Sequence, residues 1–414
     1  MAILEILVVI CTFPILNFAS KLFVGADHVL TSEENLCRCF PGEICWPTKD
    51  EWSTFNQSIG GNLVFTVPIG SVCHHELFNA QKCTDLQNAW HAPETHIESS
   101  HSIMAPFWAN MSCDPFLPRD SRCIVGTYVQ YAVNATRIED FQTTVVWARE
   151  RNLRLVVRNT GHDYIGKSTG AGTLSIWTHY LKSFNVIDHA SSYYTGKAIK
   201  VGAGIEIEEA NTMAHAQRLT VVGGNCPTVG LAGGFTQGGG FGLLTSRYGF
   251  GAQQVLQWEV VTTSGDVLLA TPELNSDLYW ALSGGGGGTY GVVFSMTVKA
   301  YAEETTSAVN LSFSSDGIPL DTYYEAVKVF HDCLPALTDA GGVAIYSLQN
   351  TSFSLASSMG PNISKEAMDH ILSPVILKLD ALSITYRKSS ISLYLSMKKY
   401  LTCPAIRIYI PSIS

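Results

Sequence analysis

Charged side chains are scarce in this sequence. Asp, Glu, Lys and Arg together make up 15% of the 414 residues, whereas apolar residues make up 46%, so the chain is expected to bury a large core. Acidic residues outnumber basic ones, and the net charge is −9. Because no dense run of Lys and Arg appears, we expect neither nucleic acid nor an anionic membrane surface as a partner.

Long apolar runs are also missing, apart from one near the N-terminus. Residues 6–16 are almost wholly apolar, a length that suits the core of a signal peptide and is too short to span a bilayer. We therefore predict a signal peptide over residues 1–20, a secreted or secretory-pathway protein and no membrane segment. Six Asn-x-Ser/Thr sequons agree with this compartment and are predicted glycosylation sites. They lie at Asn56, Asn110, Asn134, Asn310, Asn350 and Asn362.

Cysteine is unevenly distributed: seven of the eleven lie between residues 37 and 123. In an oxidising compartment such a cluster forms disulfides. The stretch "CRCFPGEIC" is also compatible with a metal site, but no histidine follows at zinc-finger spacing and Pro-Gly favours a tight disulfide loop. We predict disulfides here and no metal site. Cys73 and Cys83 repeat the spacing of Cys113 and Cys123, and we expect local pairing, although the connectivity stays open.

Strand and helix signals alternate after residue 123, where the loop-rich, cysteine-rich segment ends. "DFQTTVVWARERN" places Phe141, Val145 and Ala148 on one face of a helix, with Asp140 near its start. "LRLVVR", "TLSIWT" and "AIKVGAG" are expected strands, and "EIEEANTMAHAQR" is an expected helix. "VLQWEVVTTSGDVLLAT" predicts a hairpin around Ser264-Gly265, and a helix, a glycine turn and a strand are expected after it. The mixture predicts the α+β class with layered sheets.

Glycine is concentrated in three stretches, residues 161–172, 223–242 and 284–291. The Gly-Lys-Ser at 166–168 lacks the upstream glycine and the following helix of a P-loop. No strand is followed by a proper G-x-G-x-x-G, which argues against a nicotinamide dehydrogenase. Several such loops in one domain instead predict a large phosphate-bearing ligand held by backbone N–H groups.

Two of these stretches carry long motifs, "VVRNTGHDYIGKSTG" and "GGNCPTVGLAGGFTQGGGFG". In this order they strongly resemble the FAD-linked oxidoreductases of the vanillyl-alcohol oxidase superfamily, especially the berberine-bridge-enzyme-like group of fungi. The predicted signal peptide over 1–20 is followed by a cysteine-rich segment over 21–123, and the resemblance implies a two-subdomain, PCMH-type FAD-binding domain over 124–303. It further implies an incomplete α/β substrate-binding domain over 304–386. Residues 387–414 form an atypical tail without a counterpart.

The resemblance also implies how FAD is held. In the family, a histidine at the position of His162 bonds to the 8α-methyl group of the flavin, and in doubly linked members a cysteine at the position of Cys226 bonds to flavin C6. Imidazole and thiolate are suitable nucleophiles for an electrophilic ring. Asn159, Thr160 and Gly161 are expected to offer backbone donors to the pyrophosphate. The remaining implied cofactor residues are Asp163, Gly223, Gly224, Thr228, Gly230, Gly233, Gly234 and Val293.

Three further residues or segments are placed near the cofactor by the resemblance or by packing. Residues 238–242 and Tyr248 are expected to pack along the same cleft, with core packing an equal interpretation for Tyr248. Phe241 stands where fungal relatives often have histidine, which implies a difference in the substrate pocket.

The implied activity is removal of hydride from a small organic substrate, with O2 as acceptor, in fungal secondary-metabolite biosynthesis. The alternatives are a carbohydrate oxidase and an inactive flavin-binding remnant. The family continues through more of the substrate domain and a terminal segment that returns to the flavin domain, so we expect a C-terminally truncated chain. Because the catalytic base comes from that later portion, it stays unassigned.

Overall fold

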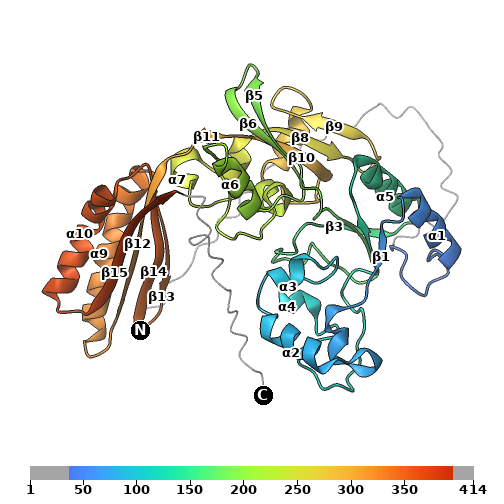
Figure 1. Ribbon diagram of the computed structural model, residues 1–414, viewed down its shortest axis with the longest axis horizontal. Coiled ribbons are helices and arrows are strands. Elements are labelled where there is room, and N and C mark those ends of the chain that lie inside the picture. Colours follow the sequence, from blue (N-terminus) through green and yellow to red (C-terminus); the bar gives the residue numbers. More distant parts are fainter. Residues whose placement is uncertain (1–36, 395–414) are drawn as a thin grey trace, which may run out of the picture. The chain divides into compact units, whose positions relative to one another are not determined.

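The structure, a computed structural model, describes residues 37–394, and its helices and strands belong to one compact unit that begins at Arg38 (Figure 1). The predicted signal peptide lies outside the described residues. The described part contains two four-stranded sheets, one five-stranded sheet and one two-stranded pair, each accompanied by helices or loops. This mixed content confirms the predicted α+β class.

The first sheet contains the strand that leads into the first glycine stretch. Its strands, in order across the sheet, are β1 (Leu63–Phe65), β2 (Tyr131–Asn134), β4 (Thr173–Trp177) and β3 (Arg154–Arg158). β2 and β3 both run parallel to β4, whereas β1 is antiparallel to β2. Parallel strands need a crossover connection, and helix α5 (Ile138–Glu150) joins β2 to β3. Phe141, Val145 and Ala148 of α5 are buried, as their spacing predicts.

The cysteine-rich segment is built into this sheet and its core. It supplies β1 and helix α1 (Lys49–Ser58), whose Trp52 and Phe55 pack in the same cluster as Phe141. Thr48 begins α1 with a capping box, because its side chain accepts a bond from the backbone N–H of Glu51 and the Glu51 carboxylate accepts one from the backbone N–H of Thr48. The segment therefore does not form a separate domain.

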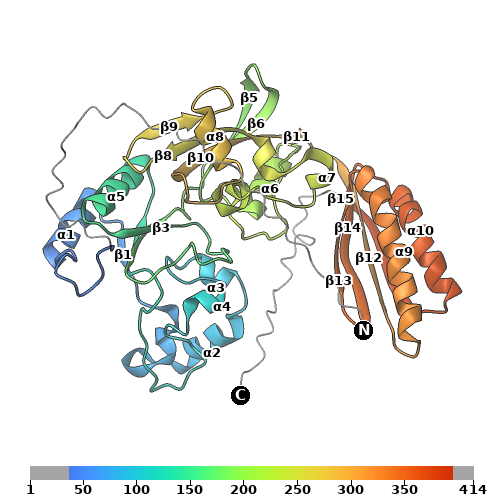
Figure 2. The same cartoon turned by 180° about the vertical axis from the view of Figure 1, so that it is seen from behind.

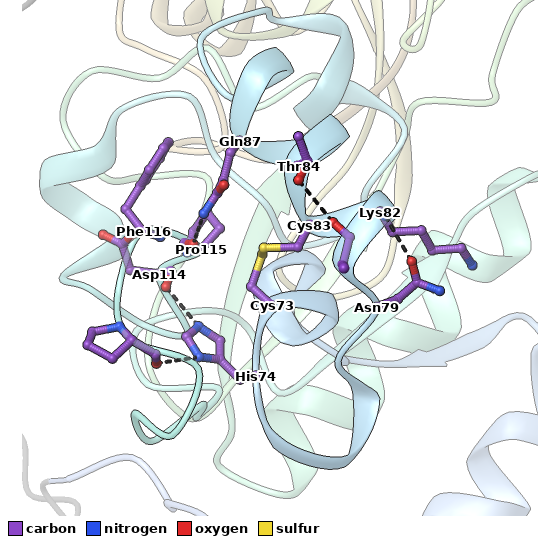
Figure 3. Close-up of a disulfide and its surroundings, with 12 residues drawn as sticks. Cys73, His74, Asn79, Lys82, Cys83, Thr84, Gln87, Asp114, Pro115 and Phe116 are labelled. Atoms are coloured by element: carbon purple, nitrogen blue, oxygen red, sulfur yellow. Dashed lines mark hydrogen bonds between the residues drawn. A yellow bond between two sulfur atoms is a disulfide. The ribbon is translucent and has the colours of Figure 1, made fainter.

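Disulfides fasten the loops that follow β1, as Figure 3 shows for Cys73 and Cys83. The helices here are η1 (Ile69–Cys73), η2 (His75–Leu77), α2 (Ala80–Ala89), α3 (Glu94–Ile97) and α4 (Pro106–Ala109). The expected pairings Cys73–Cys83 and Cys113–Cys123 are confirmed. The Cys39–Cys45 disulfide takes up two sulfur atoms that the alternative metal site needed.

The Cys73–Cys83 disulfide joins η1 to α2, and polar contacts hold the surrounding loops. The imidazole nitrogens of His74 lie 3.2 and 2.8 Å from the carbonyl oxygens of Pro118 and Asp114 (Figure 3). Asn79 caps α2 by accepting a bond from the backbone N–H of Lys82 at 3.0 Å.

The second sheet is antiparallel, and its strands come from the segments that follow each of the three glycine stretches. Its strands, in order, are β5 (Phe184–Ala190), β6 (Thr195–Gly202), β10 (Val292–Lys299), β8 (Val255–Val261) and β9 (Val267–Ala270). Helices α6 (Ile207–His215) and α8 (Ser276–Leu282) accompany it, and their apolar residues share a core with Trp258 and Ile199. The predicted hairpin is confirmed as β8–β9, with Gly265 in its turn at a φ of 93°.

The third sheet is formed by the C-terminal part of the described residues. Its strands, in order, are β13 (Val343–Leu348), β14 (Ser352–Pro361), β12 (Thr305–Ser314) and β15 (Tyr386–Tyr394). Helices α9 (Leu320–Asp339) and α10 (Lys365–Ala381) lie on one face of this sheet in both views (Figures 1 and 2), over a core that includes Phe330 and Phe353. The predicted boundary at residue 386 falls at the first residue of β15, which pairs with β12.

The remaining elements are short. Between α6 and β8 lie β7 (Leu219–Thr220), η3 (Leu231–Phe235), α7 (Thr245–Tyr248) and η4 (Gly251–Gln254), and β11 (Tyr301–Ala302), between β10 and β12, pairs with β7. Between residues 37 and 394, no helix has both the length and the apolar character needed to cross a bilayer.

Candidate functional site

The three glycine stretches, far apart in the sequence, meet at the C-terminal end of β3. A Cβ atom added to Gly230 would lie 2.5 Å from Cγ of Asn159, and one added to Gly287 would lie 2.8 Å from Cα of Gly234. Such distances are shorter than real Cβ contacts, so these positions require glycine. Asn159, which leads into the first stretch, thus touches the second stretch, and the second touches the third. Residues of all three stretches form the walls of one cleft.

The cleft encloses a cavity of about 430 Å³. Ten of the thirteen predicted cofactor residues line it: Asn159, Thr160, Gly161, His162, Asp163, Cys226, Gly230, Gly233, Gly234 and Val293. Further lining comes from Ala203, Gln237 and residues 286–288.

Three predicted cofactor residues do not line the cavity. Gly223 and Gly224 lie beside Ile207 and Phe235, and a Cβ added to Gly242 would lie 2.0 Å from the carbonyl oxygen of Gly223. They allow close backbone packing behind the cavity wall. Thr228 is buried, and its Oγ1 lies 2.7 Å from Nε2 of His162. Thr228 therefore contacts the predicted attachment residue.

His162 is held as a neutral imidazole at ordinary pH. Burial is the largest cause that lowers its pKa to about 4, and the positive charge of Arg158 and the neighbouring His96 contribute to the same shift. A neutral imidazole has a lone pair on one nitrogen and a proton on the other. The side chain at the cavity wall is thus in the form that can act as a nucleophile.

Arg158, the last residue of β3, lies directly behind this loop. Its guanidinium is fully buried and donates from Nη2 to the carbonyl oxygen of His96 at 2.8 Å. Among the described residues no carboxylate forms an ion pair with it, and burial lowers its pKa to about 9. A Cβ added to Gly161 would lie 2.6 Å from Arg158 Nη1. Gly161, at a φ of 84°, lets the loop pass over this side chain.

Asp163 organises the loop after His162. Its carboxylate accepts hydrogen bonds from the backbone N–H groups of Ile165 at 3.3 Å, of Ser168 at 3.2 Å and of Lys167. Nε1 of Trp108 donates to the carbonyl oxygen of Tyr164 at 2.9 Å and fastens the same loop to α4. Asp163 therefore shapes the cavity wall, in addition to lining it.

Cys226 also lines the cavity, and its sulfur forms a disulfide. One sulfur atom cannot hold both a disulfide and a flavin carbon. The second attachment bond thus stays a prediction, and it competes with this disulfide.

Gln237 and Lys167 also line the cavity and were not among the predicted cofactor residues. Gln237 is only 4% exposed, and its Nε2 donates to the carbonyl oxygens of Ala232 at 3.1 Å and Gly233 at 3.3 Å. Its Oε1 has no hydrogen-bond partner among the described residues and belongs to a side chain that lines the cavity. Both residues lie within glycine stretches, and this position is the feature of the sequence that could have indicated their place in the cavity wall.

The residues of the cavity fit FAD. Glycine cradles allow close approach of a large flat ligand, and the unpartnered Oε1 of Gln237 and Oδ1 of Asn159 need donors that FAD has on its ring, ribityl chain and ribose. The apolar Val293 and Ala203 cover another part of the wall.

Tyr248 and Phe241 are not among the residues that line this cavity. The Tyr248 ring stacks on Tyr301 with 3.9 Å between centroids, and its hydroxyl lies 3.2 Å from the Glu304 carboxylate. Tyr248 does not line the cavity, so its packing interpretation holds and the cleft interpretation is wrong. Phe241 is 72% exposed and is also absent from the lining.

Known proteins that resemble this chain have names that refer to FAD, in agreement with the fit of this cavity to FAD. The sequence matches the FAD binding domain family over residues 129–271. The FAD-linked oxidoreductase sor8 of Hypocrea jecorina is 56% identical over 381 residues, which span 92% of this chain and 66% of that protein. The FAD-linked oxidoreductase sthB of Phaeosphaeria nodorum is 42% identical over 70% of this chain and 92% of its own length.

A solved structure shares the fold closely. The VAO-type flavoprotein MtVAO615 from Myceliophthora thermophila C1 is 42% identical, superposes with a TM-score of 0.84, and is matched over 86% of this chain and 66% of that chain. This chain therefore belongs to the FAD-linked oxidoreductases of the vanillyl-alcohol oxidase type. It spans 66%, 61% and 63% of the lengths of three curated relatives that it matches.

Proposed function

We propose that this chain binds FAD covalently through His162 and oxidises a small organic molecule with O2 as the acceptor. The observation that carries the proposal is a neutral imidazole on the wall of a cavity in which three glycine stretches meet. The names of the relatives support an oxidoreductase that uses FAD. FAD, when bound, supplies a hydride acceptor that oxygen can regenerate.

The chain's own residues would hold the cofactor in three ways. The first and third glycine stretches would approach it with their backbones, and Gln237 would accept a hydrogen bond from it. Thr228 would fix the imidazole: with Oγ1 accepting from Nε2–H, the lone pair of His162 lies on Nδ1. That nitrogen is then the proposed point of attachment.

The proposed setting is the secretory pathway of a fungus. The relatives reported above are fungal, and three disulfides stabilise the part of the chain that the structure describes. Asn110, Asn310, Asn350 and Asn362 are exposed and open to glycosylation, whereas Asn56 and Asn134 are half-buried. A role in secondary-metabolite biosynthesis is part of this proposal.

The lowered pKa of His162 predicts how attachment depends on pH. A histidine with an ordinary pKa of about 6.5 loses its nucleophilic form as the pH falls through that value. With a pKa of about 4, the His162 imidazole stays neutral from pH 8 down to about 5 and is protonated only below that. We expect the rate of covalent incorporation of FAD into apoprotein to be flat across that range and to fall near pH 4. A midpoint near 6.5 would contradict the burial argument.

The function itself is tested on purified, flavin-loaded protein. We expect yellow colour that stays with the polypeptide after acid denaturation, together with oxygen uptake and hydrogen peroxide release on an alcohol or amine substrate. Retained colour without oxygen uptake on any substrate of a broad panel, including oligosaccharides, would favour an inactive flavin-binding remnant. A colourless protein from cells supplied with riboflavin would exclude both.

A further inference from the structure

A second cavity, of about 340 Å³, adjoins the first. Four residues line both: Val157, Lys167, Gly287 and Gly288. Its apolar lining comes from α5, β3, β8 and β10, with Val145, Leu155, Val261 and Val292 among its members. Besides Lys167, the polar lining residues are Arg154, Thr262, Thr263 and Thr289. His162 and Gln237 line only the first cavity. A long ligand whose one end lies at His162 would reach the second cavity past Lys167.

Between residues 37 and 394, Lys167 is the only Lys or Arg that lines the first cavity. Its Nζ donates to Oγ1 of Thr289 at 2.7 Å, which ties the first glycine stretch to the third. Nζ also lies 3.4 Å from the position of a Cβ added to Gly286. No carboxylate among the described residues forms an ion pair with it. The ammonium group therefore has a neutral partner only.

We propose that Lys167 is the cation that pairs with the pyrophosphate of FAD. The inference rests on the proposed binding of FAD and identifies the positively charged side chain of that binding site. The pyrophosphate carries the negative charges of FAD and lies in the middle of the molecule, between the flavin and adenosine halves. Lys167 lies where the two cavities meet. The phosphates of an FAD molecule that spans both cavities would therefore lie next to the ammonium group.

The loop of residues 161–172 has fewer free backbone donors for a phosphate, because several of its N–H groups already donate to Asp163. A positively charged side chain, Lys167, can take their place. The N–H groups of Ile165, Lys167 and Ser168 donate to the Asp163 carboxylate and are not available to a phosphate. The Asp163 carboxylate also adds a negative charge to the cavity wall, which disfavours an anion. A lysine acts as a point charge on phosphate and offsets this repulsion. Arg154 lines only the second cavity, and Arg158 lines neither.

The test measures the binding of ligands with and without phosphate. In a His162→Ala/Cys226→Ala background, in which neither predicted bond forms, dissociation constants for FAD and for riboflavin are measured by flavin fluorescence. We expect Lys167→Gln to weaken FAD binding about tenfold, the size of a charge-assisted hydrogen bond, and to leave riboflavin binding unchanged. Lys167→Arg should restore FAD binding. Lys197→Gln, which removes a charge on the β5–β6 hairpin, should have no effect.

Unchanged FAD affinity in Lys167→Gln would overturn the inference. Equal weakening of FAD and riboflavin would also overturn it, because it would show a structural role. If the background variant does not fold, the same substitutions are made in the otherwise unchanged apoprotein, and the FAD concentration that gives half-maximal covalent loading is compared. Absence of FAD binding in every variant, and in the unchanged protein, would instead refute the proposed function, and this inference with it.

Discussion

Replacing His162 by alanine is expected to abolish flavin attachment at the glycine loop of residues 161–172. The imidazole lines the cavity, and burial keeps it in the neutral form that can act as a nucleophile. After acid denaturation and digestion, the peptide that contains residue 162 should carry no flavin mass, whereas the unchanged protein carries it there. Retained flavin per chain, read from visible absorbance, should fall from full occupancy to background if His162 is the single point of attachment.

The result expected for His162→Ala depends on whether Cys226 also bonds to the flavin. If it forms a second bond, the His162→Ala protein keeps its flavin on the peptide that contains residue 226, and only the His162→Ala/Cys226→Ala protein releases it. His179→Gln is a matched control, because burial also lowers the pKa of His179 to about 4 but its side chain does not line the cavity. Flavin that stays attached to the double variant after denaturation would refute both attachment sites.

Replacing Gly161 by alanine is expected to destabilise the protein strongly and to distort the cavity wall. A φ of 84° costs a residue with a Cβ about 1–2 kcal/mol. The added atom would lie 2.6 Å from Nη1 and 2.9 Å from Cζ of Arg158, which is fully buried, and such overpacking costs about 1–3 kcal/mol more. Urea unfolding should therefore show a clearly lower free energy of unfolding, together with poor flavin loading.

Gly234 provides the matched control for this substitution. It lines the same cavity, but an added Cβ would have no atom within 4 Å and its φ lies outside the strained positive range. Gly234→Ala should change the free energy of unfolding by no more than about 0.5 kcal/mol. Equal effects at the two glycines would show that the buried Arg158 does not restrict this loop.

Much of the fold could be predicted from local patterns. The face of α5, the strands that flank the first glycine stretch and the β8–β9 hairpin follow from periodicity and turn residues, which act over a few positions. The disulfides within two C-x9-C repeats also follow, because short loops bring their ends together. The resemblance to flavoproteins directed attention to ten residues that do line the cavity.

The remaining features depend on contacts between distant segments. Gly223 and Gly224 have the composition of a ligand-binding loop, but they face Ile207 and Phe235, which no local pattern reveals. Tyr248 packs on Tyr301 from another element. Lys167 acquires its position from Thr289, more than a hundred residues later, and the unpartnered oxygen of Gln237 appears only once the side-chain amide is fixed by two carbonyl groups.

Peptide mapping of the unchanged protein tests the attachment most directly. The protein is produced with ample riboflavin, digested without reduction, and the flavin-absorbing peptides are identified by mass spectrometry. We expect the dinucleotide mass on the fragment that holds the imidazole at position 162, as the proposed attachment requires. Flavin mass found on neither that fragment nor the one holding the cysteine at 226 would contradict it.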